Sequence, residues 1–253
     1  MEIAINPIQA FLIGIVYYLG IDGTPWTTHL GSHTWLRPIF NGFIVGIILG
    51  DPVQGTIIGA AINLPYLAFI SAGGSVPMDP ALAGTVGTAL ALGANVSPSV
   101  ATTMAIPIGL LGTIIWIVHM TVDTTFVHMA DKAAEEGDIR KVNILHVAPP
   151  QIFLFIISVI PVAFAVYFGV DAVQWLIDAL SGKPLDILSA IGGILPALGI
   201  AMNLRAMNGS GKLIFFLLGF LLTAYSGLPI LALSIFGAII AWIWTTLDLK
   251  GEY

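Results

Sequence analysis

Long stretches without a charged side chain constrain this chain more than any other feature of its sequence. They lie between the following pairs of charged residues: Asp51 and Asp79, Asp79 and Asp123, Lys141 and Asp171, and Lys212 and Asp248. The hydrocarbon core of a bilayer is about 30 Å thick, so an α-helix needs about 20 residues to cross it. Each stretch is long enough for one or two crossings, which predicts a protein that crosses a membrane several times.

The scarcity of charge also excludes several classes of protein. Charged residues make up 9% of the 253 residues, whereas a soluble domain carries about 25%. The 8 Lys and Arg residues, in a chain of net charge −6, form no basic patch, so we expect no nucleic-acid partner. The sequence contains no cysteine, which excludes disulfides, zinc-thiolate sites and thiol nucleophiles.

Glycine and proline interrupt the apolar stretches. A Leu-Pro-Tyr run at 64–66 breaks the stretch after Asp51, the apolar run 81–94 is short for a full crossing, and a Gly-Leu-Pro run at 227–229 divides the last stretch. Irregular backbone survives at membrane depth only where protein buries it or where it lines a wet cavity. We therefore expect an all-α polytopic membrane protein, a transmembrane helix bundle with re-entrant hairpins or discontinuous helices, in one membrane-embedded domain over residues 1–253.

Glycines recur at four-residue spacing in two runs, at Gly42, Gly46 and Gly50 and then at Gly55 and Gly59. Such spacing places small residues along one helix face and is typical of helices whose backbones approach closely. We expect a compact bundle from this pattern, and we assign it no function of its own.

Two segments are polar enough to lie outside the hydrocarbon core. Residues 123–146 hold Lys132, Arg140 and Lys141, and by the positive-inside rule we place them on the cytoplasmic side, with a helix stop at Gly137. Residues 171–186 mix apolar side chains with charged ones, which is typical of an amphipathic helix in the membrane interface.

Asp79 is unusual because it is a carboxylate between two long uncharged stretches. At the centre of a membrane helix an Asp costs about 2.5–3.5 kcal/mol, and it is tolerated where it faces a wet cavity or a hydrogen-bonding ligand. In the alternative reading, the loop before Pro80 reaches the membrane surface and Asp79 is a turn residue or a helix N-cap. The sequence leaves both readings open.

Other polar residues near the predicted breaks are candidates for binding a solute. Asn63 precedes Pro65, and Ser71 and Ser75 follow it. Their amide and hydroxyl groups suit hydrogen bonds to sugar hydroxyls, or they satisfy backbone groups that the proline leaves free. The full set of predicted substrate-binding residues is Asn63, Ser71, Ser75, Asp79, Gln9 and Gln54.

The sequence contains no catalytic or metal signature. His119 and Asp123 stand four residues apart, where they can hydrogen-bond on one helix face, and we favour a structural pair. No carboxylate near His29 and His33 completes a zinc site, and nucleotide-binding and serine-hydrolase motifs are absent. We therefore expect no catalytic site, no metal and no cofactor.

Three runs of the sequence resemble a known family. They are Arg37-Pro38 followed by GFIVGIILGDPVQGTIIGAAINL, then AGGSVPMDPALAGTVGTALAL, and later HMADKAAEEG from His128. In this order, and across essentially the whole chain, they are similar to the IIC subunit of the mannose/fructose/sorbose class of bacterial sugar phosphotransferase systems.

The resemblance implies a multi-pass permease subunit in the lipid bilayer of the bacterial cytoplasmic (inner) membrane. Such a subunit works with a second membrane subunit, IID, as a trimer of IIC–IID heterodimers. Cytoplasmic IIA and IIB proteins carry phosphate from phosphoenolpyruvate to the sugar during import. By position, the sugar site of the family corresponds here to Asn63, Ser71 and Asp79, in a core domain that moves relative to a scaffold.

One position departs from the family pattern. Members usually carry Glu, within a GxxxE-type run, where this sequence has Asn63. Loss of a carboxylate removes a charge-assisted acceptor for sugar hydroxyls, so the sugar can be neutral or anionic. We hypothesise that Asn63 relaxes repulsion against an anionic sugar; an Asn63→Glu variant with unchanged preference between neutral and uronic or sulfated sugars would remove the idea.

Two other functions compete with the phosphotransferase reading. A stand-alone proton-coupled transporter of sugar or another small solute would use Asp79 as its proton carrier, and uptake would need only a pH gradient. A membrane receptor or scaffold would keep its function when Asp79 is replaced by Leu. The family motifs favour the phosphotransferase subunit.

Overall fold

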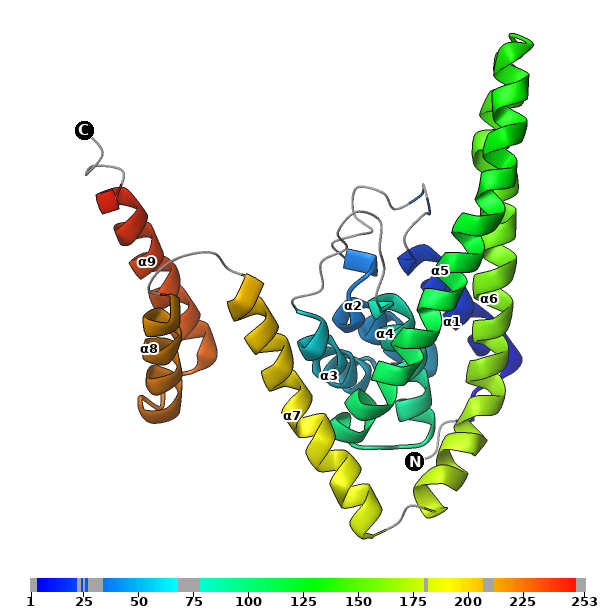
Figure 1. The fold of residues 1–253 in the computed structure, drawn as a ribbon. Coiled ribbons are helices and arrows are strands. Elements are labelled where there is room, and N and C mark those ends of the chain that lie inside the picture. The colour runs from blue at the N-terminus through cyan, green and yellow to red at the C-terminus, as the bar shows by residue number, and fades with distance from the viewer. Residues whose placement is uncertain are drawn as a thin grey trace. The chain divides into compact units, whose positions relative to one another are not determined.

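The computed structural model describes residues 4–21, 24, 26, 34–67, 78–179, 182–206 and 212–248, and every regular element in these ranges is a helix (Figure 1). The all-α prediction is therefore confirmed. The chain forms two compact units, Met1–Ile200 and Ala201–Tyr253. The elements are α1 (Pro7–Gly20), α2 (Pro38–Leu49), α3 (Pro52–Asn63), the short 3-10 helix η3 (Leu64–Tyr66), α4 (Pro80–Gly93), α5 (Pro98–Glu135), α6 (Ile139–Ala179), α7 (Lys183–Ala206), α8 (Lys212–Tyr225) and α9 (Ile230–Asp248).

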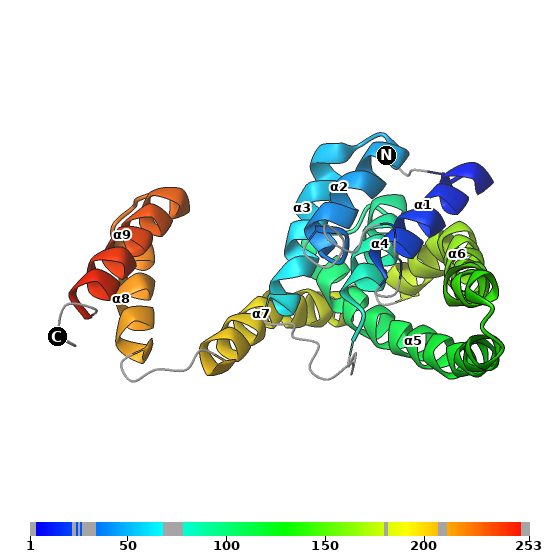
Figure 2. The same cartoon turned by 90° about the horizontal axis from the view of Figure 1, so that it is seen from above.

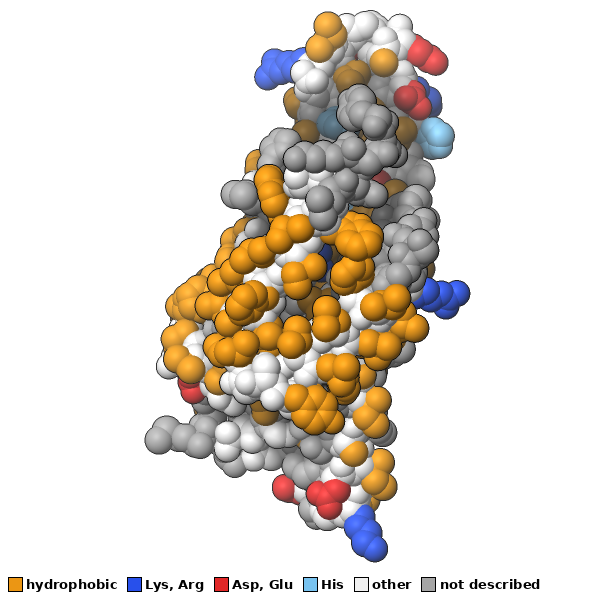
Figure 3. Space-filling model, turned by 90° about the vertical axis from the view of Figure 1, so that its left-hand side faces the viewer, with side chains coloured by type: hydrophobic (Ala, Val, Ile, Leu, Met, Phe, Trp, Pro, Cys, Tyr) orange, Lys and Arg blue, Asp and Glu red, His pale blue; other side chains and the backbone are white. Residues whose placement is uncertain are grey.

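The two longest helices, α5 and α6, form a hairpin in the first unit. They have 38 and 41 residues, and each contains an apolar window that can cross a membrane. Their connection passes through Gly137, whose φ of 74° lies in the left-handed region that favours glycine. The hairpin extends beyond the shorter helices of the first unit (Figure 1), and charged side chains gather at its end (Figure 3). The predicted polar segment 123–146 is this end of the hairpin.

Helices α2 and α3 form a second, shorter hairpin. Each has 12 residues, or about 18 Å of rise, which is less than a bilayer core. Their backbones touch: a Cβ on Gly42 would lie 2.5 Å from the carbonyl oxygen of Gly55, and one on Gly59 would lie 2.6 Å from that of Pro38. The turn uses Gly50 at a φ of 89°. The glycine spacing therefore reflects the close packing of these two helices. Helix α3 ends at Asn63, so the predicted interruption of the apolar stretch before Pro65 is confirmed.

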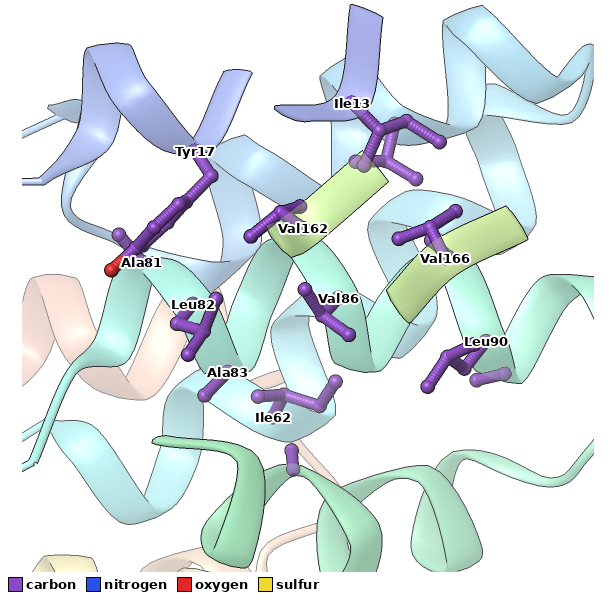
Figure 4. Packing of buried hydrophobic residues seen from close by; sticks show 14 of the residues in the cluster. Ile13, Tyr17, Ile62, Ala81, Leu82, Ala83, Val86, Leu90, Val162 and Val166 are labelled. Carbon is purple, nitrogen blue, oxygen red and sulfur yellow. The ribbon is translucent and has the colours of Figure 1, made fainter. Parts of the chain in front are cut away.

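Helix α4 lies in the middle of the first unit, and all of its residues from Pro80 to Gly93 are buried. Figure 2 shows it surrounded by α1, α2, α3, α5 and α6. Its side chains are mostly small, so neighbouring helices approach it closely, and Val86 and Leu90 meet Ile62 of α3 and Val166 of α6 in one cluster (Figure 4). A helix covered by protein on every side need not be long enough to reach both surfaces of a membrane.

The predicted amphipathic interfacial helix over residues 171–186 does not form as a separate element. Helix α6 continues to Ala179, and α7 begins at Lys183 after Gly182, whose φ is 84°. No glycine or proline lies between Asp171 and Ala179 to end α6 earlier. The amphipathic stretch is therefore divided between the end of one helix and the start of the next.

The second unit contains α8 and α9, joined through Gly227 at a φ of 68°, so the predicted break at 227–229 is confirmed. Both helices are apolar, and large side chains such as Leu231 and Trp242 are 74% and 76% exposed within the chain. Surface of this kind requires an apolar environment, because water would not solvate it favourably.

Candidate functional site

Asp79 lies at the start of α4, and its side chain is at the junction of three helices. The residue is 4% exposed. Its Oδ1 accepts a hydrogen bond from the backbone N–H of Leu82 (2.9 Å), which makes it the N-cap of α4. Its Oδ2 accepts a hydrogen bond from the hydroxyl of Tyr17 in α1 (2.7 Å), and Figure 4 shows Tyr17 reaching the start of α4 beside Ala81. The N-cap of the second reading is therefore confirmed and the residue is buried within the bundle, whereas a wet cavity or ligand at Asp79 stays a prediction.

The third helix at this junction is α5, which presents glycines to Asp79. The backbone N–H of Asp79 donates to the carbonyl oxygen of Gly109 (2.8 Å). A Cβ on Gly112 would overlap the side chain of Asp79, and one on Gly109 would lie 2.5 Å from the hydroxyl of Tyr66 and 3.1 Å from the carbonyl oxygen of Asp79. The absence of side chains on this face of α5 allows Asp79 and Tyr66 to lie there together.

Asn63 ends α3, one turn before Tyr66. Its side-chain oxygen Oδ1 is buried and, within the described part of the chain, accepts no hydrogen bond. A buried acceptor without a donor loses its hydration and gains nothing in return, so a group that donates a hydrogen bond there would be bound favourably. Asn63 is therefore a candidate contact for a polar solute.

The remaining predicted residues divide into two groups. Gln9 has a structural role, because its Oε1 accepts from the N–H of Asn6 (3.0 Å) and its Nε2 donates to the carbonyl oxygen of Ile48 (3.0 Å). Gln54 is in the first turn of α3, where its N–H donates to Asp51 Oδ1 (2.9 Å). Ser71 and Ser75 lie outside the described residues. The structure does not bring Gln9 or Gln54 into contact with Asp79.

Sequence reasoning missed Tyr17 and Tyr66, which are among the largest fully buried side chains. The hydroxyl of Tyr66 donates to the carbonyl oxygen of Ala105 in α5 (3.4 Å). A usable signal was present, because both residues place a hydroxyl group within or beside apolar stretches, where a buried polar atom needs a partner.

The arrangement suits hydrogen bonding to a solute. A carboxylate and two phenolic hydroxyls lie close to the junction of α1, α4 and α5, and a buried amide lies at the end of α3. The side chains of Arg37 and Asn41 donate to backbone carbonyls of Tyr66 and Ala81 in the same region. Among the described residues, no group of three or more His, Cys, Asp or Glu side chains is placed to hold a metal ion. Such a set can recognise hydroxyl groups of a solute.

Comparisons with known proteins match nearly the whole chain to one family. The sequence pattern of the family described as "PTS system sorbose-specific iic component" matches residues 7–243. The mannose-specific EIIC component of the PTS system of Escherichia coli (strain K12) is 29% identical over 246 residues, which cover 97% of this chain and 91% of that protein.

Two solved structures are also similar. One is described as "Structure of membrane protein" and is 28% identical, with a TM-score of 0.83 and coverage of 98% of this chain and 99% of that one. The other is a chain of the cryo-EM complex of the mannose transporter ManYZ and microcin E492, which is 27% identical, with a TM-score of 0.58 and full coverage (100%) of both chains.

Proposed function

This chain belongs to the family of sorbose-specific IIC components of phosphotransferase systems, and from that membership we propose that it moves a hexose, or a close derivative of one, across the bacterial inner membrane. The family's description names a IIC component of a phosphotransferase system. We further propose that the sugar is phosphorylated during import by partner IIA and IIB proteins, and that the chain works with a IID subunit in a trimer of heterodimers. The polar end of the α5–α6 hairpin faces the cytoplasm in this proposal.

The observation that supports this function best is the buried position of Asp79. A carboxylate in the interior of an apolar bundle is costly unless function or structure requires it. Here it lies where α1, α4 and α5 meet, beside a tyrosine hydroxyl. We place the sugar site at Asp79 and Asn63 and keep Ser71 and Ser75 as proposed contacts. Gln9 and Gln54 stay predictions from the sequence.

The test is sugar-dependent stabilisation of the purified chain together with its neighbouring membrane subunit. A sugar at one hundred times its Kd stabilises the folded state by about 2.7 kcal/mol, which a thermal melt detects. We expect Asp79→Asn to keep the cap of α4, because Asn caps helices as well as Asp does, and to lose most of the sugar-dependent shift. Asp79→Ala removes the cap as well, so it should also lower the melting temperature without sugar.

The outcomes separate the site from the function. An Asp79→Asn variant with the full sugar-dependent shift would remove Asp79 from the site but leave the family function in place. If uptake into vesicles needs only a pH gradient, and neither phosphoenolpyruvate nor the soluble partners, the result would support the proton-coupled alternative. The observation that favours this alternative is the buried carboxylate of Asp79, which could carry the proton. Retention of function by Asp79→Leu would favour a receptor or scaffold.

A further inference from the structure

His119, which is buried, and Asp123, which is partly buried, form a second polar pair that the proposed sugar site does not use. Nε2 of His119 lies 3.3 Å from Oδ2 of Asp123, and the two side chains are 4% and 23% exposed. The ring of Trp116 packs edge-on against the imidazole, with ring centroids 6.1 Å apart. The predicted pairing on one helix face is therefore confirmed, with His119 buried and Asp123 partly buried.

The pair continues the face of α5 that contacts Asp79. The buried residues along this helix include Ala105, Gly109, Gly112 and His119, whose spacings of three, four and seven residues return to the same side of an α-helix. Gly112 packs against Asp79. Seven residues correspond to about 10 Å of rise, so His119 lies two turns from Asp79 toward the end of the hairpin.

Each member of the pair has a buried acceptor to which no described residue donates. Nδ1 of His119 and Oδ1 of Asp123 are buried and have no hydrogen-bond partner within the part of the chain that the structure describes. When Nε2 carries the imidazole proton toward the carboxylate, Nδ1 is an acceptor, and a carboxylate oxygen accepts as well. Leaving two such atoms unpaired in the interior costs free energy, which a donor group would recover.

The burial of the pair limits what the donor can be. At 3% exposure, His119 is out of reach of a helix from another protein. A comparable pair near the end of the hairpin, His128 and Asp131, has side chains that are 81% and 68% exposed, so water supplies its hydrogen bonds. The donor at His119 and Asp123 must therefore be a small group that enters the bundle.

We propose that His119 and Asp123 are a second contact point for the transported solute and that they bind a hydroxyl or amino group of a sugar. This inference rests on the proposed transport function. A carboxylate and a neutral imidazole acceptor both repel an anionic group, so the pair selects neutral sugars or amino sugars. It disfavours the uronic and sulfated sugars that Asn63 alone leaves open.

The experiment measures Kd on the full chain purified with its neighbouring membrane subunit. The probes are D-mannose, L-sorbose, D-glucosamine and D-glucuronate, and the variants are Asp123→Asn and His119→Gln. We expect each variant to raise the Kd of the sugars that the wild-type protein binds by about tenfold or more, the loss of one hydrogen bond to a charged or buried group. The matched control is His128→Gln with Asp131→Asn, which changes the same residue types at the exposed pair and should leave Kd unchanged.

The pattern of weakening identifies the bound group. Equal weakening of D-mannose and D-glucosamine assigns a hydroxyl group, and weakening of D-glucosamine alone assigns the amino group. Wild-type Kd values in both variants would overturn the inference and leave the proposed function standing, whereas a wild-type protein that binds none of the four sugars would overturn both. If the variants fail to fold, the wild-type protein still tests the inference. Tighter binding of D-glucuronate than of D-glucosamine by the wild-type protein would contradict it.

Discussion

Replacing Gly112 by Ala tests whether the close packing of α5 on Asp79 determines the stability of the first unit. The added Cβ would overlap the Asp79 side chain at its Cβ, Cγ and Oδ2 atoms. Asp79 cannot move away freely, because its carboxylate is held by Leu82 and by the hydroxyl of Tyr17. The variant must therefore either displace α5 or break one of these hydrogen bonds.

The expected effect is larger than the gain that alanine brings to a helix. Overpacking of this kind costs about 1–3 kcal/mol, and breaking a hydrogen bond to a buried charge costs about 1.5–3 kcal/mol. Alanine in place of glycine recovers only about 0.5–1 kcal/mol inside a helix. Gly112→Ala should thus destabilise the protein. Gly219→Ala in α8 should be neutral or stabilising, because no atom of the described residues lies within 4 Å of the new Cβ.

The assay is the thermal melt of the purified complex, with both variants compared with the wild-type protein. For a chain of about 250 residues, 1 kcal/mol changes the melting temperature by about 2–4 °C. We expect Gly112→Ala to melt several degrees below Gly219→Ala and to lose sugar-dependent stabilisation. Equal melting temperatures for the two variants would show that α5 does not pack on Asp79 in this way.

Two further changes test the contacts around this site and the α2–α3 turn. Tyr17→Phe removes the hydroxyl that donates to the buried Asp79 and should destabilise the protein by about 1–3 kcal/mol. The control, Tyr167→Phe, lies at a position that is 41% exposed and should change the melting temperature little. Equal changes in melting temperature would contradict the role of Tyr17. Gly50→Ala forces an L-residue into a φ of 89° and should destabilise the protein by about 1–2 kcal/mol, although no described atom lies within 4 Å of the added Cβ. A melting temperature equal to that of the wild type would show that this turn can relax.

Local breaks in the chain were predictable from the sequence because their causes are local. Pro65 ends α3, Gly137 and Gly227 adopt positive φ between helices, and α4 occupies the short apolar run that follows Asp79. Each of these depends on residues within a few positions of the break.

The surroundings of Asp79 were not predictable in the same way. Its hydroxyl donor, Tyr17, is 62 positions away in the chain, and the glycines that make room for it lie on a third helix. The sequence alone could therefore identify the carboxylate as unusual but could not predict its partners, and the structure shows that it both caps α4 and is buried. The prediction of one interfacial helix over 171–186 was wrong because α6 continues through the first part of the segment to Ala179 and α7 begins within it at Lys183.

The complete burial of α4 has a consequence for how the protein is made. At 14 residues, or about 21 Å, this helix is too short to cross a bilayer core of about 30 Å, and it begins with an ionisable cap. It cannot insert into lipid as an independent span during synthesis. It must therefore insert after the longer helices α5 and α6 have been made, by packing between them and the other helices. A chain truncated before Pro98 would therefore leave α4 without a stable place in the membrane and expose it to degradation.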